Sequence, residues 1–258
     1  MKRLRTLAHG CAVLYVFLWI GGMISYALEG GPPDALAWTA PLFLALASAV
    51  VLLYAPPGAR LPLVLAGLIG YAAEVPGTHL GVPFGHYIYT EVLFPHLFSV
   101  PLVLVCAWLI LIAYVWDMLR PLGWPRIAAA LAGAAWMTAI DGVIDPLAGG
   151  PLNYWEWEGT GPYHGIPWTN FLGWFAVSFV IFLAIPAPDR ANPAARLVGC
   201  SVIVFFGVIA AAEALAGPIT VAALLAALHG VWIYAERRCS RPPRAYSSKY
   251  SSDGSNGG

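Results

Sequence analysis

The stretch RIAAALAGAAWMTAIDGVIDPL, residues 126–147, is long and apolar enough to cross a lipid bilayer as one α-helix. A spanning helix needs about 20 mainly apolar residues. Seven other apolar runs share this character, and Pro76-Gly77 is expected to end the shortest of them. The sequence therefore predicts an all-α fold, a polytopic transmembrane helical bundle of about eight spans, with helices at 7–28, 36–54, 61–75, 98–117, 126–147, 167–186, 197–213 and 218–236.

Basic residues occupy only alternate breaks between these runs, so all 13 Lys and Arg residues can lie on one side of the membrane. Short loops rich in Lys and Arg stay in the cytoplasm. We therefore expect an integral protein of the inner or plasma membrane with both termini cytoplasmic. The opposite side collects acids and histidines, which makes it the candidate working face.

The composition excludes several classes of protein. Of 258 residues, 60% are hydrophobic and 10% charged, whereas soluble domains average about 25% charged residues. We expect a single transmembrane domain, 1–240, and a disordered cytoplasmic tail, 241–258, rich in Pro, Ser, Gly and Asn. Basic residues scattered singly argue against nucleic-acid binding. The cysteines lack CxxC spacing and the histidines lack HxxxH or HExxH spacing, so no metal site is expected.

Two long connections on the expected outer side are rich in Gly, Pro, Tyr and Trp. Residues 76–97 contain GVPFGHYIYTEVLFPH, and residues 148–167 contain GGPLNYWEWEGTGPYHGIP. An aromatic belt at the membrane interface explains part of this composition. Non-helical backbone near the bilayer must also be buried in protein or line a wet cavity. We therefore predict two structured non-helical loops on the outer face, covering a cavity.

Acidic residues inside spans are costly, and they are candidates for function. At a rise of 1.5 Å per residue, Glu74, Asp141, Asn170 and Glu213 fall at about one depth in the outer half of the bilayer. Asp145 follows Asp141 by four residues, which places both carboxyls on one helix face. With no Lys or Arg on that side, these groups must share protons, accept hydrogen bonds or stay neutral.

Some of these residues also have a plainer explanation. Ala216-Gly217-Pro218 follows shortly after Glu213, and Val-Pro-Gly directly follows Glu74, so either acid is also consistent with a helix end at the headgroups. His229, within the last expected helix, is equally consistent with a packed core residue and with a proton relay.

Residues 70–89 and 141–174 contain a set of motifs. They are Glu74, Phe84-Gly85-x-Tyr87-x-Tyr89, Asp141-x-x-x-Asp145-Pro146, Trp155-x-Trp157, Tyr163-x-Gly165-x-Pro167 and Asn170-Phe171-x-Gly173-Trp174. In combination these motifs resemble the membrane carotenoid hydratase family, which includes bacterial carotenoid 1,2-hydratases and archaeal bisanhydrobacterioruberin hydratases. The remaining helices match in character only.

The resemblance implies a hydro-lyase of carotenoid biosynthesis that needs no cofactor. Such an enzyme adds water to the terminal C1=C2 double bond of an acyclic carotenoid, of the lycopene or gamma-carotene type, and forms a tertiary alcohol. The implied partners are the membrane-embedded carotenoid, water, the lipid bilayer and other carotenoid enzymes.

The residues suit this chemistry, because two carboxyls that share a proton supply an acid and a base together. Tyr and Trp faces attract the carbocation that protonation of the alkene would create. We expect Asp141, Asp145 and Glu74 to be catalytic, with Glu213 and His229 as possible relays. The expected substrate-binding residues are Tyr87, Tyr89, Trp155, Trp157, Tyr163, His164, Asn170 and Trp174.

Three other functions remain open from the residues. A polyene cyclase or isomerase would use the same acid, and its cation would lose a proton instead of capturing water. A non-enzymatic carotenoid or lipid carrier would need the acids only for structure. A proton-coupled transporter is disfavoured, because the sequence has neither inverted repeats nor an intramembrane Lys or Arg.

Overall fold

The computed structural model describes residues 2–239, apart from the side chains of Lys2, Asp34, Arg237 and Cys239. The expected tail, 241–258, lies outside the described residues. The described chain folds into eight α-helices, of which six are long and apolar enough to cross a membrane. The helices are α1 (Lys2–Glu29), α2 (Thr39–Tyr54), α3 (Pro57–Leu80), α4 (Leu104–Leu119), α5 (Arg126–Ala148), α6 (Trp168–Ala184), α7 (Pro193–Ala212) and α8 (Ala216–Cys239).

Two apolar helices, α2 and α6, are shorter than an untilted span. The structure therefore establishes a mostly helical membrane bundle with six helices that are long enough to span.

The shorter elements all lie in the connections. The short elements are the 3-10 helices η1 (Asp34–Leu36), η2 (Glu91–Leu93) and η3 (Arg120–Leu122), and the strands β1 (Tyr87–Tyr89), β2 (His96–Leu97), β3 (Val100–Pro101) and β4 (Trp155–Trp157).

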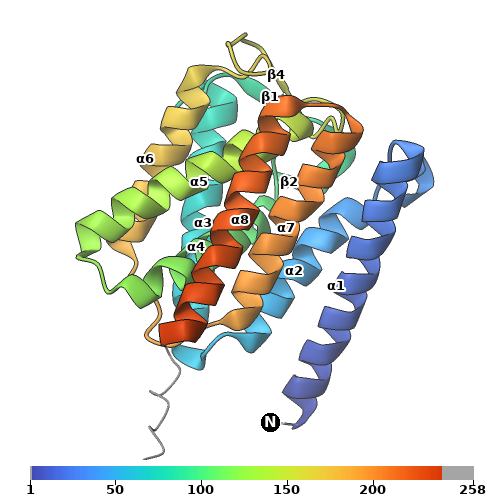
Figure 1. Ribbon diagram of the computed structural model, residues 1–258. Helices are drawn as coiled ribbons and strands as arrows, with labels where there is room; N and C mark the ends of the chain where they lie inside the picture. The colour runs from blue at the N-terminus through green and yellow to red at the C-terminus, as the bar shows by residue number, and fades with distance from the viewer. Residues whose placement is uncertain (1, 240–258) are drawn as a thin grey trace, which may run out of the picture.

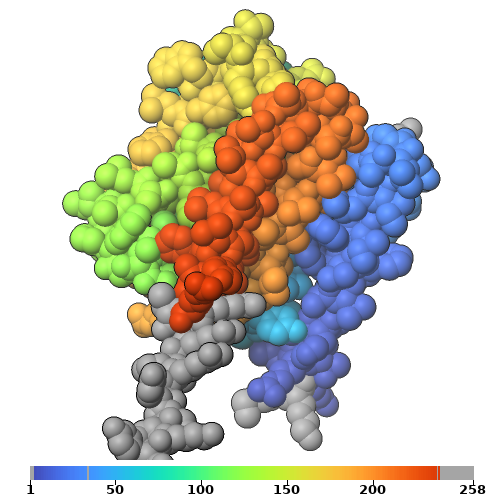
Figure 2. Space-filling model, in the orientation of Figure 1, coloured from blue at the N-terminus to red at the C-terminus, as the bar shows by residue number. Residues whose placement is uncertain are grey.

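Helix α4 forms the centre of the bundle, and α1 lies at its edge. In the most apolar window of α4, 72% of residues are buried, against 6% in α1. A helix that is apolar all round must be covered all round, and α2, α3 and α7 pack against α4. Figure 1 shows α1 beside α2 and α7, and Figure 2 shows α8 on the surface between α5 and α7.

Helix α3 is longer than the sequence predicts. Pro76 was expected to end it, but the helix continues to Leu80. A proline inside a helix removes only one hydrogen bond, and tertiary packing can offset that loss. The helix ends at Gly81, whose left-handed φ of 70° and N–H bond to the Gly77 carbonyl form a C-cap. The extension keeps Glu74 well inside the helix, so the expectation that it could mark a helix end is wrong.

The two long connections meet at one end of the bundle, where β1 pairs antiparallel with β4 (Figure 1). Tyr87 lies opposite Trp157, and Tyr89 lies opposite Trp155. Alternate side chains of a strand point to opposite faces. Ile88 is therefore exposed, while Tyr87 is buried against the bundle.

The opposite end is held by a buried ion network. Arg196 was expected in a cytoplasmic break, but it lies in the first turn of α7 and is only 8% exposed. Its guanidinium donates to the Asp117 and Glu236 carboxylates, and to the Asp117 carbonyl at 3.0 Å. The network ties α4, α7 and α8 together, and this is why Arg196 can be buried.

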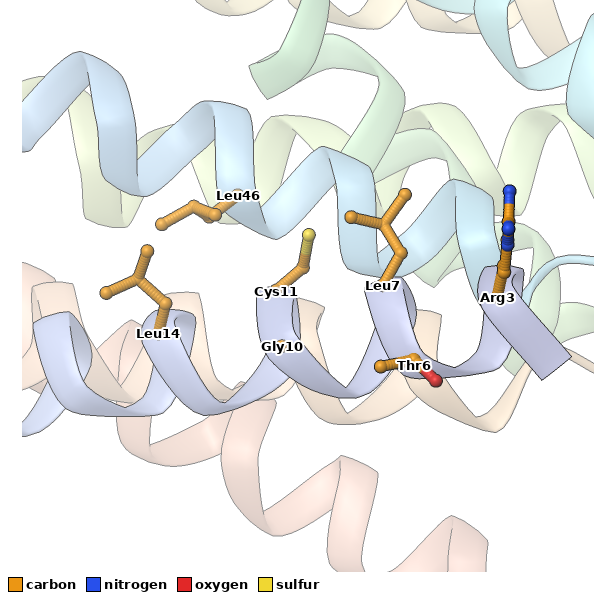
Figure 3. Close-up of a pocket in the computed structure, with 7 residues that line it drawn as sticks. All are labelled: Arg3, Thr6, Leu7, Gly10, Cys11, Leu14 and Leu46. Atoms are coloured by element: carbon orange, nitrogen blue, oxygen red, sulfur yellow. The ribbon is translucent and has the colours of Figure 1, made fainter.

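An apolar groove lies between the first half of α1 and the middle of α2. Figure 3 shows Arg3, Leu7, Cys11 and Leu14 projecting from α1 toward α2, and Leu46 projecting from α2. None of the residues that line this groove is acidic. The groove therefore offers no carboxyl group to a substrate.

Candidate active site

Four buried polar side chains meet beneath the paired strands. Glu74 comes from α3, Asp141 and Asp145 from α5, and Asn170 from α6. Their exposed fractions are 4%, 1%, 1% and 2%. The structure thus brings together three of the four groups that the sequence placed at one depth, together with Asp145. We call these four residues the acid cluster.

Asn170 bridges the two aspartates. Its Nδ2 donates to Oδ2 of Asp141 at 2.8 Å and to Oδ2 of Asp145 at 2.7 Å. A side-chain amide nitrogen carries two hydrogens, so one Asn can serve both carboxyls at once. The bridge holds the carboxyls side by side, which favours a single proton shared between them.

Asp145 also receives a hydrogen bond from the loop. The Trp155 Nε1 donates to Oδ1 of Asp145 at 2.8 Å. Trp157 lies close to the same carboxyl, but its Nε1 makes no hydrogen bond of normal geometry. Strand β4 therefore covers the acid cluster with two indole rings.

Glu74 accepts more hydrogen bonds than either aspartate. Tyr87 donates to Oε2, Tyr89 donates to Oε2 at 3.1 Å, and the Trp108 Nε1 donates to Oε1 at 3.0 Å. Burial, and then the charge of Glu74, raises the pKa of Tyr87 far above its ordinary value. Tyr87 therefore remains a protonated donor, and the three donors to Glu74 offset part of the cost that burial places on its ionised form.

The described ion pairs lie elsewhere in the molecule. They join His96 to Glu91, and Arg120 or Arg196 to acids at the other end of the bundle. Within residues 2–239 the acid cluster thus has hydrogen-bond donors but no cationic partner.

Aromatic rings enclose the acid cluster. Trp108 and Trp174 stack with centroids 4.4 Å apart and an interplanar angle of 16°. Tyr87 packs on Trp157 at 5.0 Å, and Tyr89 on Trp155 at 5.8 Å. Trp108 was not among the expected site residues, because within an apolar run it looks like an ordinary core residue. Nothing in its position, four residues after the start of α4, marks it as a site residue.

Phe84 is a second site residue absent from the predicted set, although it lies within the Phe84-Gly85-x-Tyr87 motif. It is 1% exposed and packs near Tyr87 and Trp108. Added Cβ atoms at Gly77 and Gly173 would come within 3.1 Å and 2.7 Å of its ring. The two glycines therefore make room for Phe84 between α3 and α6.

Tyr163 reaches α5 from the second connection. Its hydroxyl donates to the Gly142 carbonyl at 2.8 Å. In a regular helix this carbonyl would accept from the N–H of residue 146, but Pro146 has none. His164, whose ring lies 4.7 Å from that of Tyr163, is exposed, and the structure does not bring it into the acid cluster.

The two expected relay residues also lie outside the acid cluster. Glu213 caps the end of α7 and is exposed. Nδ1 of His229 is hydrogen-bonded to the Tyr114 hydroxyl at 3.3 Å. His229 also interacts electrostatically with Arg196 at the other end of the bundle. The depth of a residue along its helix gives only its position along the bundle. The helix face on which the residue lies decides whether it joins the acid cluster.

Comparisons with known proteins agree with this arrangement. Residues 38–232 match the family model described as carotenoid biosynthesis protein. The bisanhydrobacterioruberin hydratase of Haloarcula japonica is 29% identical over 208 residues, which cover 73% of this chain and 68% of the relative. No solved structure matches the chain. The predicted resemblance to carotenoid hydratases is thus confirmed, and the chain belongs to the carotenoid biosynthesis protein family.

Proposed function

We propose that this protein is a membrane hydratase that adds water to the terminal C1=C2 double bond of an acyclic carotenoid end group. The observation that carries this proposal is the acid cluster, which holds three buried carboxyls without a cationic partner among the described residues. Aromatic rings surround it. Alkene hydration needs a neutral acid, a stabilised carbocation and a water molecule, and this site suits each requirement.

Asp141 is the better candidate for the proton donor. It accepts one hydrogen bond, from Asn170, whereas Asp145 also accepts one from Trp155. Donors favour the ionised form of a carboxyl, so the shared proton belongs on Asp141. The proton moves from Asp141 to C2 of the alkene, and the positive charge develops at C1.

The ionised groups and the rings stabilise that charge. Asp145 and Glu74 place fixed negative charge around the cation, which is the largest contribution such a site can make. The ring faces of Tyr and Trp each add about 0.5–2 kcal/mol. Water then bonds to C1 and releases a proton to a carboxylate, so alkene and water give a tertiary alcohol and the acid is restored.

The substrate fits a membrane site. The hydrocarbon core of a bilayer is about 30 Å thick, and an extended carotenoid has a similar length. Its end group would reach the end of the bundle where the paired strands lie. The reaction requires no cofactor, because every atom of the product comes from the alkene and from water.

The decisive experiment uses purified protein in lipid nanodiscs with lycopene as the probe, in water enriched in oxygen-18. We expect a carotenoid alcohol that carries the label. Unlabelled cyclic or isomerised products would establish the cyclase or isomerase instead. Tight binding with no product would establish a carrier.

We also propose that both termini are cytoplasmic and that the paired strands face outward. The grouping of basic residues supports this orientation. Cysteine introduced at Glu158, in the loop after β4, should react with an impermeant maleimide added outside intact cells. Cysteine at Arg190, between α6 and α7, should react only after lysis. The reverse pattern would invert the protein and place the acid cluster near the cytoplasm.

A further inference from the structure

Gly142 stands apart from the other buried helical glycines of the described chain. An added Cβ at Gly142 would meet no atom within 4 Å. Glycine inside a helix is destabilising relative to alanine, so close packing usually explains it. Here packing does not explain it. An added Cβ would instead lie within 2.8 Å of another atom at Gly67, Gly70, Gly77, Gly133, Gly173 and Gly199.

The open space lies beside the acid cluster. Gly142 directly follows Asp141, and at 3.6 residues per turn it lies about 60° around the helix from Asp145. The residue itself is buried. The space is therefore on the surface of α5 next to both aspartates, and inside the protein.

Polar groups border this position. Pro146 leaves the Gly142 carbonyl without its helical partner, and the Tyr163 hydroxyl donates to that carbonyl at 2.8 Å. A carbonyl oxygen has a second lone pair, and a phenol that donates can still accept. Tyr163 also lies within electrostatic reach of Asp141. A buried water needs two to four polar partners, and these groups can supply them.

We propose that the space at Gly142 holds the water that captures the carbocation, with Gly142 as a positioning residue that leaves room for it. The inference rests on the proposed function and identifies the source of its nucleophile. The water oxygen bonds to C1, and one of its protons passes to the carboxylate that protonated C2. A cation with no water at this position loses one of the two hydrogens now on C2 to the carboxylate, either the delivered one or the one that the alkene carried, and reforms the alkene.

The test compares two outcomes of the same cation in deuterated water. Capture by water gives the alcohol, and a return to the alkene in which the original C2 hydrogen is lost leaves deuterium in recovered lycopene. The change is Gly142→Ala, whose methyl group fills the space without a clash. The matched control is Gly230→Ala, because Gly230 is exposed on α8 and its added Cβ also meets nothing within 4 Å. Both variants are assayed in nanodiscs beside the unmodified protein.

We expect Gly142→Ala to keep its Tm, to lower alcohol formation about ten-fold, and to leave deuterium exchange at or above the original rate, because a displaced water no longer captures the cation. Gly230→Ala should leave the ratio of alcohol to exchange unchanged. Tyr163→Phe removes one partner of the water without filling the space, so it should shift the same ratio less. This second variant decides the question if Gly142→Ala does not fold.

A competing explanation is that Gly142 relieves crowding between its carbonyl and the ring of Pro146. Gly142→Ala would then lower the Tm and leave the ratio unchanged, and that result would overturn the inference. Equal losses of alcohol and exchange would overturn it too. Unmodified protein that yields neither alcohol nor exchange would instead refute the proposed hydratase, and the water site with it.

Discussion

Buried charge is arranged in opposite ways at the two ends of the bundle. At one end Asp117 accepts from Arg196 and from the Asn192 backbone N–H at 2.7 Å, so its charge is matched by a cation. At the other end Asp141 and Asp145 share Asn170, and no cation reaches them among the described residues. Both arrangements bury carboxyls to about the same degree.

The difference separates structure from chemistry. A buried carboxylate paired with arginine is held in its charged form. Removing one partner leaves the other as a buried charge without compensation. A carboxyl pair with neutral donors can pass one shared proton between its two members while its total charge stays the same. We therefore expect substitutions in the acid cluster to affect turnover, and substitutions in the ion network to affect stability.

The largest effect should come from Asp141→Asn and Asp145→Asn. An amide cannot protonate carbon, so turnover should fall by about 10²–10⁴-fold, the range for loss of a general acid. The Tm should change little, because an amide replaces a carboxyl of similar shape. Alcohol formation per folded protein measures the first expectation, and thermal unfolding in detergent the second. Near-normal turnover in both variants would remove the pair from the mechanism.

Arg196→Gln should show the opposite result. It removes the cation that is hydrogen-bonded to buried Asp117 and leaves only Arg120, whose Nε lies 3.7 Å from Oδ1 of Asp117, so it should cost up to about 3–5 kcal/mol of unfolding free energy. Turnover of the protein that remains folded should stay close to normal. The matched control is Arg190→Gln, since Arg190 is exposed and makes no described ion pair. If Arg196→Gln were as stable as that control, the ion network would not hold the bundle together.

Glu74→Gln should have an intermediate effect on turnover, a loss of about 10–100-fold. It removes a negative charge near the cation while the proton donor stays in place. Tyr89→Phe keeps that charge and removes one of three donors, so its loss should be smaller. Turnover and substrate binding should be measured for both variants. A larger loss in Tyr89→Phe would show that orientation of Glu74, rather than its charge, is what catalysis needs.

Aromatic substitutions should have the smallest effects. Leucine at Trp155, Trp157, Tyr163 or Trp174 should lower turnover about five- to thirty-fold, from the loss of about 1–2 kcal/mol of cation stabilisation. Substrate binding should change less, because the charge exists only in the transition state. Trp168→Leu is the control, since Trp168 is 65% exposed on the same helix as Trp174. Equal losses in the control would return these residues to the interfacial belt.

Much of this site was predictable from short-range patterns. The spacing of Asp141 and Asp145 placed two carboxyls on one helix face, and the structure keeps them together. Counting residues along helices brought Glu74 and Asn170 to the same depth. These predictions succeeded because helix rise and rotation depend on the local backbone alone. They failed for Glu213, which has the right depth and lies outside the acid cluster.

Other features depended on contacts between distant segments. Asn170 lies 29 residues from Asp141 and Trp108 lies 34 residues from Glu74, and no periodicity links either pair. The pairing of Tyr87 with Trp157 joins two connections that are each irregular on their own. Arg196 was expected in a break between helices because it is basic, and the partner that allows its burial, Asp117, lies 79 residues away in the sequence.

The physical reason lies in the range of the forces. Hydrophobicity and charge act residue by residue, so the chain alone specified a membrane protein, its family and the acids worth attention. Hydrogen bonds act over about 3 Å and require a defined direction. Which donors reach Glu74, which amide joins the aspartates, and where space remains beside Gly142 were therefore decided only when the helices packed.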